Sequence, residues 1–168
     1  GAGTSHIRVF GLPINEFAIG TELNVSWYCF KNFKEIYYTI MPDRVEAGTY
    51  LMATAIAGGE VVLRNTCPDH LTSIINLLKN AKIDISLCEC GMRVKANSRP
   101  EISDCIVTLP YPGFPTDMQA QLMTLFSIAD GKNYIVESVF ENRCAHVHEL
   151  QKMHANISSI GNCFAIQG

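Results

Sequence analysis

The chain has 168 residues, of which 48% are hydrophobic and 17% charged, a composition that suits a globular core and argues against a disordered chain. Its net charge of −3 gives no general attraction to nucleic acid or to an anionic membrane. No apolar run approaches the roughly 20 residues of a membrane span. We therefore expect neither nucleic acid nor a membrane as a partner. Because the chain begins at Gly1 without an initiator Met or a signal-peptide pattern, we interpret it as a segment of a longer protein.

Seven cysteines are scattered along the chain without any CxxC pair, so the usual spacings of zinc and thioredoxin sites are missing. We expect free thiols and a reducing, cytoplasmic location. Cys88 and Cys90 share one face of a predicted strand end, where a metal pair is one interpretation and a pair of small buried hydrophobes the favoured one. His146 and His148 also suggest a metal, but no third ligand has a defined place nearby, so we predict no metal site.

The first part of the chain has one clear strand pattern and one irregular stretch. Residues 5–10 alternate and predict a strand, whereas residues 12–38 show no sustained period and are interpreted as a linker or insertion with some strand character. From Ile40 the pattern sharpens. It predicts, in order, a helix from Asp43 to a stop at Gly58 and Gly59, a strand over Glu60–Thr66, a helix over Pro68–Asn80 and a hairpin around Cys90 and Gly91.

The second half repeats this order at an offset of about 72 residues, which aligns Gly59 with Gly131. It predicts a strand over Asp104–Pro110, a helix over Thr116–Ala129, a strand over Asn133–Phe140, a helix over Ala145–Met153 and a hairpin around Gly161 and Asn162. The sequence therefore predicts an α/β fold whose helices cover a sheet, built from two tandem units at about 40–96 and 104–168.

The repeat extends to an unusual choice of residue after the second helix of each unit. A glycine is expected at the left-handed position there, but the chain has Lys82 and His154, which are separated by the same offset. A non-glycine residue in that conformation costs on the order of 1 kcal/mol. Either the two helices end differently, or the protein tolerates some lost stability.

The stretch YPGFPTDMQAQ, residues 111–121, gathers turn-forming residues and an acid in front of a predicted helix. One interpretation is capping, in which Thr116 or Asp117 accepts hydrogen bonds from the free N–H groups of the first turn. The other is that Asp117 is a catalytic base. The local sequence alone favours capping.

A second stretch, ESVFENRCAHVHEL, covers residues 137–150 and connects a predicted strand to a helix. Phe140 lies beside Arg143 at the carboxyl end of that strand, which is typical of a sugar platform with an anion contact. A helix cap with a surface salt bridge is the alternative, and spacing alone favours it.

Three motifs in the same order, IMPDRVEAGTYL, YPGFPTDMQAQ and ESVFENR…HVHEL, closely resemble the UDP-N-acetylglucosamine 1-carboxyvinyltransferases of the enolpyruvyl transferase family. The resemblance covers residues 40–168, with a weaker match at residues 1–11. It implies the inside-out α/β barrel of that family, in which each of two domains contains three βαβαββ units. Residues 40–168 would be two units of one domain, and residues 1–39 the end of the neighbouring domain plus a crossover or insertion.

The resemblance also implies an activity, namely transfer of the enolpyruvyl group of phosphoenolpyruvate to the 3-hydroxyl of UDP-N-acetylglucosamine in peptidoglycan synthesis, without a metal or organic cofactor. By resemblance Asp117 is the general base at the sugar hydroxyl, and Arg143 is an active-site arginine near the anionic groups. The implied substrate-binding residues are Val139, through its backbone, Phe140, Thr116, Asp43, Arg44 and Glu46.

The family's proton-donating loop and its N-terminal Lys-Asn pair would lie upstream of this segment, so the rest of its own chain is an expected partner. The isolated segment is therefore expected to be inactive. A second interpretation is a non-catalytic, sugar-nucleotide-binding or regulatory remnant of the same fold.

Overall fold

The computed structural model describes residues 6–10, 35–89 and 91–168, and its contacts divide the chain into two units, Gly1–Met41 and Pro42–Gly168. In the first unit, β1 (His6–Phe10) pairs antiparallel with β2 (Glu35–Thr39). The strand predicted over residues 5–10 is thereby confirmed. Most of the stretch interpreted as a linker or insertion lies outside the described residues, and β2 covers its end.

The first half of the second unit contains two helices over a three-stranded antiparallel sheet of order β3-β5-β4. The Asp43 carboxylate caps the first helix by accepting hydrogen bonds from the N–H groups of Val45 and Glu46, at 2.7 and 3.3 Å, and Gly58 ends that helix with a φ of 76°. The elements are α1 (Arg44–Ala57), β3 (Gly59–Arg64), the 3-10 turn η3 (Pro68–Leu71), α2 (Thr72–Asn80), β4 (Asp84–Cys88) and β5 (Gly91–Ala96).

The second half contains a four-stranded sheet of order β6-β7-β9-β8, in which β6 and β7 are parallel and the other pairs antiparallel. Its elements are β6 (Cys105–Val107), the 3-10 turn η4 (Thr116–Met118), α3 (Gln119–Ile128), β7 (Lys132–Val136), α4 (Ala145–Lys152), β8 (Asn156–Ile160) and β9 (Cys163–Gln167).

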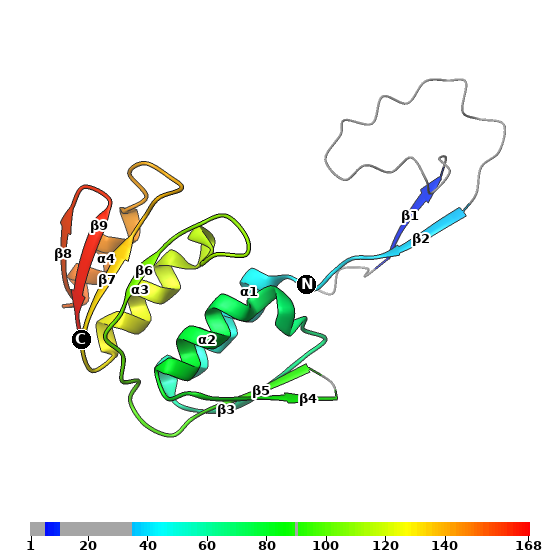
Figure 1. Ribbon diagram of the computed structural model, residues 1–168, viewed down its shortest axis with the longest axis horizontal. Helices are drawn as coiled ribbons and strands as arrows, with labels where there is room; N and C mark the ends of the chain where they lie inside the picture. Colours follow the sequence, from blue (N-terminus) through cyan, green and yellow to red (C-terminus); the bar gives the residue numbers. More distant parts are fainter. Residues whose placement is uncertain (1–5, 11–34, 90) are drawn as a thin grey trace. The chain divides into compact units, whose positions relative to one another are not determined.

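The two halves are copies of one arrangement, as Figure 1 shows. Helix α1 packs on β3 and β5 and α2 on β4, whereas α3 packs on β7 and β9 and α4 on β8. Strand β8 is the counterpart of β4 at the offset seen in the sequence. The predicted α/β fold of tandem units is confirmed, with one difference: β2, the strand before α1, pairs with β1 in a sheet of its own, so the full βαβαββ order is complete in the second half.

The predicted left-handed positions are confirmed too. Lys82 has a φ of 63° and His154 a φ of 69°. In each half, the N–H of this residue donates to the carbonyl of the residue three positions earlier. The N–H of the next residue donates to the carbonyl five positions earlier, as Ala155 does to Leu150 at 3.0 Å. These paired bonds are the Schellman motif. The two helices therefore end in the ordinary Schellman geometry. The left-handed position of that motif is occupied by a non-glycine residue, which lowers the stability of the helix end.

The core lies between the helices and the sheets, with α1 and α3 packed side by side. Gly48 of α1 allows α2 and η4 to pack closely on this helix, since a Cβ there would lie 2.9 Å from Ile74 Cδ1 and 3.0 Å from Met118 Cε. The largest fully buried side chains include Leu51, Met52, Leu78, Met92, Leu122, Phe126 and Ile135. This packing sets η4, at the start of α3, in a fixed place relative to the first half.

Candidate active site

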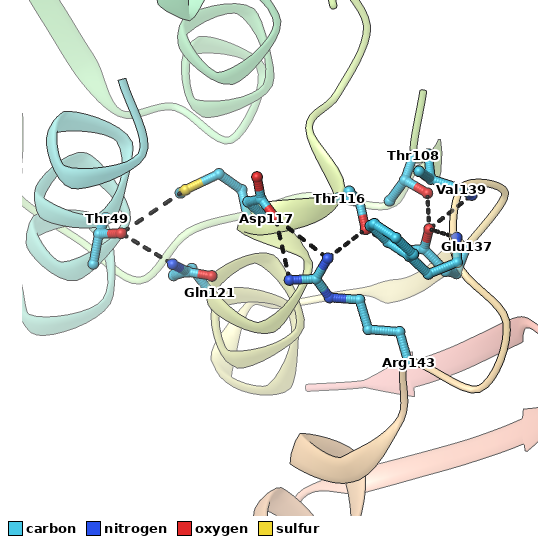
Figure 2. Close-up of polar contacts among 10 residues, drawn as sticks. Thr49, Thr108, Thr116, Asp117, Gln121, Glu137, Val139 and Arg143 are labelled. Carbon is cyan, nitrogen blue, oxygen red and sulfur yellow. Dashed lines mark hydrogen bonds and ion pairs between the residues drawn. The ribbon is translucent and has the colours of Figure 1, made fainter. Parts of the chain in front are cut away.

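Asp117 and Arg143 are brought together although they belong to different elements of the second half. Asp117 lies in η4, and Arg143 lies in the connection between β7 and α4. The Arg143 Nη1 and Nη2 groups both donate to Asp117 Oδ1, at 3.3 Å each (Figure 2). The Asp117 side chain is 55% exposed, so its carboxylate is accessible to a ligand while one oxygen is held by the guanidinium.

Capping, the interpretation favoured by the local sequence, is wrong. Pro115 is the N-cap residue of η4, and neither η4 nor α3 has a side-chain capping bond. The Thr116 hydroxyl instead donates to Glu137 Oε2 at 2.9 Å and accepts from Arg143 Nη1 at 3.1 Å. Both capping candidates are thus occupied by side chains from the end of β7 and the β7–α4 connection, which lie far away in sequence.

Glu137, at the end of β7, is a site residue that the sequence analysis did not single out. Its side chain is buried, and Oε1 accepts hydrogen bonds from the Thr108 hydroxyl at 2.8 Å and from the N–H groups of Val139 and Phe140 at 2.9 and 3.1 Å. Burial raises the pKa of this carboxyl, but the backbone and hydroxyl donors outweigh it and hold the pKa below the ordinary value. An acid directly after a buried strand was the one signal of it.

The loop after β7 presents two of the predicted sugar-binding residues. Phe140 is 52% exposed, and the Arg143 guanidinium lies 5.3 Å from the centre of its ring, a cation–π contact worth about 0.5–1 kcal/mol at an exposed site. The Val139 N–H donates to Glu137 Oε1, so a ligand that bonds the Val139 backbone would have to use its carbonyl. The loop thus places an exposed apolar ring beside a cation.

The three candidates near the start of α1 make other contacts. Asp43 is used as the α1 cap, and Glu46 lines a groove with it between α1 and the end of β3. Arg44 lies 5.0 Å from the ring of Tyr111, in the loop that leads to η4. Among the described residues, no hydrogen bond or ion pair joins Asp43, Arg44 or Glu46 to Asp117.

Metal binding receives no support from the described residues, in which no three His, Cys, Asp or Glu side chains are grouped as a metal site would need. His146 instead lies near Arg143, and burial and the positive charge of Arg143 lower its pKa, against the opposing effect of Glu137.

The expected burial of Cys88 is wrong, since the residue is exposed at the end of edge strand β4, and Cys90 lies outside the described residues. None of the described helices has the length and apolar character to cross a membrane.

The repeated α/β units belong to the enolpyruvyl transferase class of fold. The enolpyruvyl transferase NikO from Streptomyces tendae superposes with a TM-score of 0.68 at 20% identity, over 78% of this chain and 31% of that one. EPSP synthase from Acinetobacter baumannii superposes with a TM-score of 0.55 at 11% identity, over 80% and 34%.

The sequence comparison gives the family. The chain belongs to the EPSP synthase (3-phosphoshikimate 1-carboxyvinyltransferase) family, whose profile matches residues 6–168. It is 42% identical over its full length to UDP-N-acetylglucosamine 1-carboxyvinyltransferase 1 of Caldanaerobacter subterraneus and 39% identical to UDP-N-acetylglucosamine 1-carboxyvinyltransferase of Geobacter metallireducens. The chain spans 36% of the length of each of these relatives.

Proposed function

We propose that this chain is part of an enzyme that transfers the enolpyruvyl group of phosphoenolpyruvate to the 3-hydroxyl of UDP-N-acetylglucosamine, in the cytoplasmic synthesis of peptidoglycan precursors. The observation that carries the proposal is the pairing of Asp117 with Arg143 at an exposed helix entrance. The names of the relatives supply the substrates. Residues 1–39 would be the end of the neighbouring domain with its crossover or insertion, and the rest of the parent chain would complete the site.

Asp117 is the proposed general base. As the 3-hydroxyl oxygen adds to the enol carbon of phosphoenolpyruvate, the Asp117 carboxylate takes the hydroxyl proton, and the methylene carbon takes a proton from an acid supplied by the rest of the parent chain. The tetrahedral adduct then loses a proton from that methyl carbon and phosphate from the adjacent one, which restores the double bond. Arg143 keeps the carboxylate in place and presents positive charge to the anionic substrates. In this proposal the Phe140 ring and the Val139 carbonyl contact the sugar, and Thr116 fixes the guanidinium. The Asp43, Arg44 and Glu46 side chains would line the cleft further away.

The test is Asp117→Asn in the complete parent protein, with phosphate release from phosphoenolpyruvate and UDP-N-acetylglucosamine as the assay. Asn cannot accept the proton, so we expect kcat to fall by roughly 10²–10⁴. Stability should change by less than about 1 kcal/mol, because the lost ion pair is an exposed one.

The chain offers a matched control in Asp130. Its carboxylate is 58% exposed and pairs with Arg99 at 3.2 Å, much as Asp117 pairs with Arg143, but it lies at the other end of α3. Asp130→Asn should keep kcat within a few-fold of wild type. If Asp117→Asn does the same, Asp117 is not the base. A parent protein that binds UDP-N-acetylglucosamine without transferring the enolpyruvyl group would favour the non-catalytic alternative.

A further inference from the structure

We propose that Glu137 is the positioning residue of this site. It holds the Arg143–Asp117 pair in place through Thr116, and it fixes the conformation of the loop at Val139 and Phe140. The role given to the pair rests on the function proposed above. Glu137 itself is buried and is not exposed to a ligand.

The Glu137 carboxylate joins three separate pieces of chain. Its donors are the Thr108 hydroxyl after β6, the Thr116 hydroxyl in η4, and two successive N–H groups in the loop after β7. Four donors at 2.8–3.1 Å replace the water that a buried carboxylate loses. Moving any one of these pieces would leave part of a buried charge unsatisfied, which is unfavourable because the lost hydrogen bond cannot be replaced by water.

The negative charge also determines the direction of the Thr116 hydroxyl. That hydroxyl has a single proton, and because the proton is donated to Glu137 Oε2, the oxygen lone pairs remain for Arg143 Nη1. The same guanidinium then reaches Asp117 Oδ1 with both of its terminal nitrogens (Figure 2). A neutral amide at position 137 could donate to the Thr116 hydroxyl instead. The hydroxyl proton would then point toward the cationic guanidinium, and the hydrogen bond from Arg143 to Thr116 would be lost.

The first half of the Pro42–Gly168 unit shows that the fold does not require a carboxylate at the position of Glu137. At the offset of the repeat, the counterpart of Glu137 is Asn65, and the positions equivalent to Thr116, Asp117 and Arg143 are Arg44, Val45 and Leu71. The first half forms the corresponding elements α1, β3, α2, β4 and β5 around those residues. The four side chains of the network therefore serve the site of the second half and are not part of the repeated scaffold.

The test uses the complete parent protein and the variants Thr116→Val, Thr116→Ser and Glu137→Gln. Thr116→Val removes the hydroxyl between Glu137 and Arg143 but leaves the loop bonds. We expect kcat to fall about 10- to 100-fold, since misplacement of a catalytic group by 1 Å can cost about 100-fold, with the KM for the sugar nucleotide within about 3-fold. Thr116→Ser should restore kcat. Glu137→Gln also disturbs the loop, so it should lower kcat and raise that KM.

Thr49→Val is the control, because Thr49 is also a partly buried threonine whose hydroxyl accepts a side-chain donor, Gln121 at 3.0 Å. That hydroxyl also contacts Met118 Sδ at 3.8 Å, but among the described residues it makes no hydrogen bond to Asp117, Arg143 or Glu137. Thr49→Val should change neither constant. A Thr116→Val enzyme with wild-type kcat, or a Thr116→Ser enzyme as impaired as Thr116→Val, would overturn the proposal, as would a loss of kcat in Thr49→Val of equal size.

Amide hydrogen exchange separates this proposal from the proposed reaction. Glu137→Gln should speed exchange at Val139 and Phe140 by more than about 10-fold, whereas Thr116→Val should leave both rates within a few-fold of wild type. Unchanged exchange in Glu137→Gln would refute the positioning role whether or not the parent protein is active. An inactive wild-type parent with the expected exchange pattern would refute the reaction alone.

Discussion

Replacing His154 by glycine should stabilise the end of α4. His154 holds a φ of 69°, a left-handed conformation that costs a non-glycine residue about 1–2 kcal/mol. Glycine removes that cost but gives the unfolded chain more freedom, which returns about 0.4–1 kcal/mol. The His154 side chain is exposed, so little packing is lost. The net gain is about 0.5–1 kcal/mol, or roughly a 2- to 5-fold lower population of the opened helix end.

Native-state hydrogen exchange measures this gain at the Ala155 amide, whose N–H closes the cap on the Leu150 carbonyl at 3.0 Å. With intrinsic rates corrected, Ala155 in His154→Gly should exchange about 2- to 5-fold more slowly. His154→Ala is the control, because alanine removes the imidazole but keeps the strain. Equal protection in both variants would show that the side chain, and not the backbone conformation, was responsible. Faster exchange in His154→Gly would refute the assignment of strain to this position.

Two further predictions concern the isolated chain and its response to acid. The purified chain should release no phosphate above the uncatalysed rate, because the proposed site is completed by the rest of the parent protein, and steady turnover would contradict this. The folded-state pKa of Glu137 lies below its ordinary value of 4.5, so its contribution to stability is complete above that pH and is lost as pH falls through the lowered pKa. The stability advantage of wild type over Glu137→Gln should therefore shrink below about pH 4.5 in unfolding measurements, and a constant difference down to about pH 3 would contradict it.

The fold could be predicted in detail because its signals are local and occur twice. Asp43 and Gly58 mark the ends of α1 with the side-chain cap and the positive φ expected of them. The offset of the repeat then placed the elements of one half on those of the other. The predicted end of a strand differs from the observed one where the local pattern continues beyond the strand pairing. Strand β7, for example, ends at Val136 and not at Phe140. There the chain leaves the sheet so that two loop N–H groups can reach Glu137.

The site could be predicted only in part, because its bonds join residues distant in sequence. Asp117, Arg143 and Phe140 became candidates through the resemblance to the family, and their roles stay predictions. The partners of Thr116 lie 21 and 27 residues further along the chain, and a local capping rule cannot detect them. Glu137 was missed for the same reason, since within a strand pattern it is one polar residue among several. Its importance comes from donors supplied by three segments.

The turn-forming residues before Asp117 have a role that capping does not explain. The loop after β6 folds back on itself, with the Leu109 N–H donating to the Phe114 carbonyl at 2.9 Å and the Gly113 N–H donating to the Pro110 carbonyl at 2.8 Å. Gly113 is required there, because a Cβ would lie 2.5 Å from the Leu109 Cβ. A closed loop of this kind fixes the direction from which the chain enters η4. The exposed Asp117 carboxylate is therefore held from two sides, by this loop through the backbone and by Arg143 through its side chain, as the proposed role of general base would require.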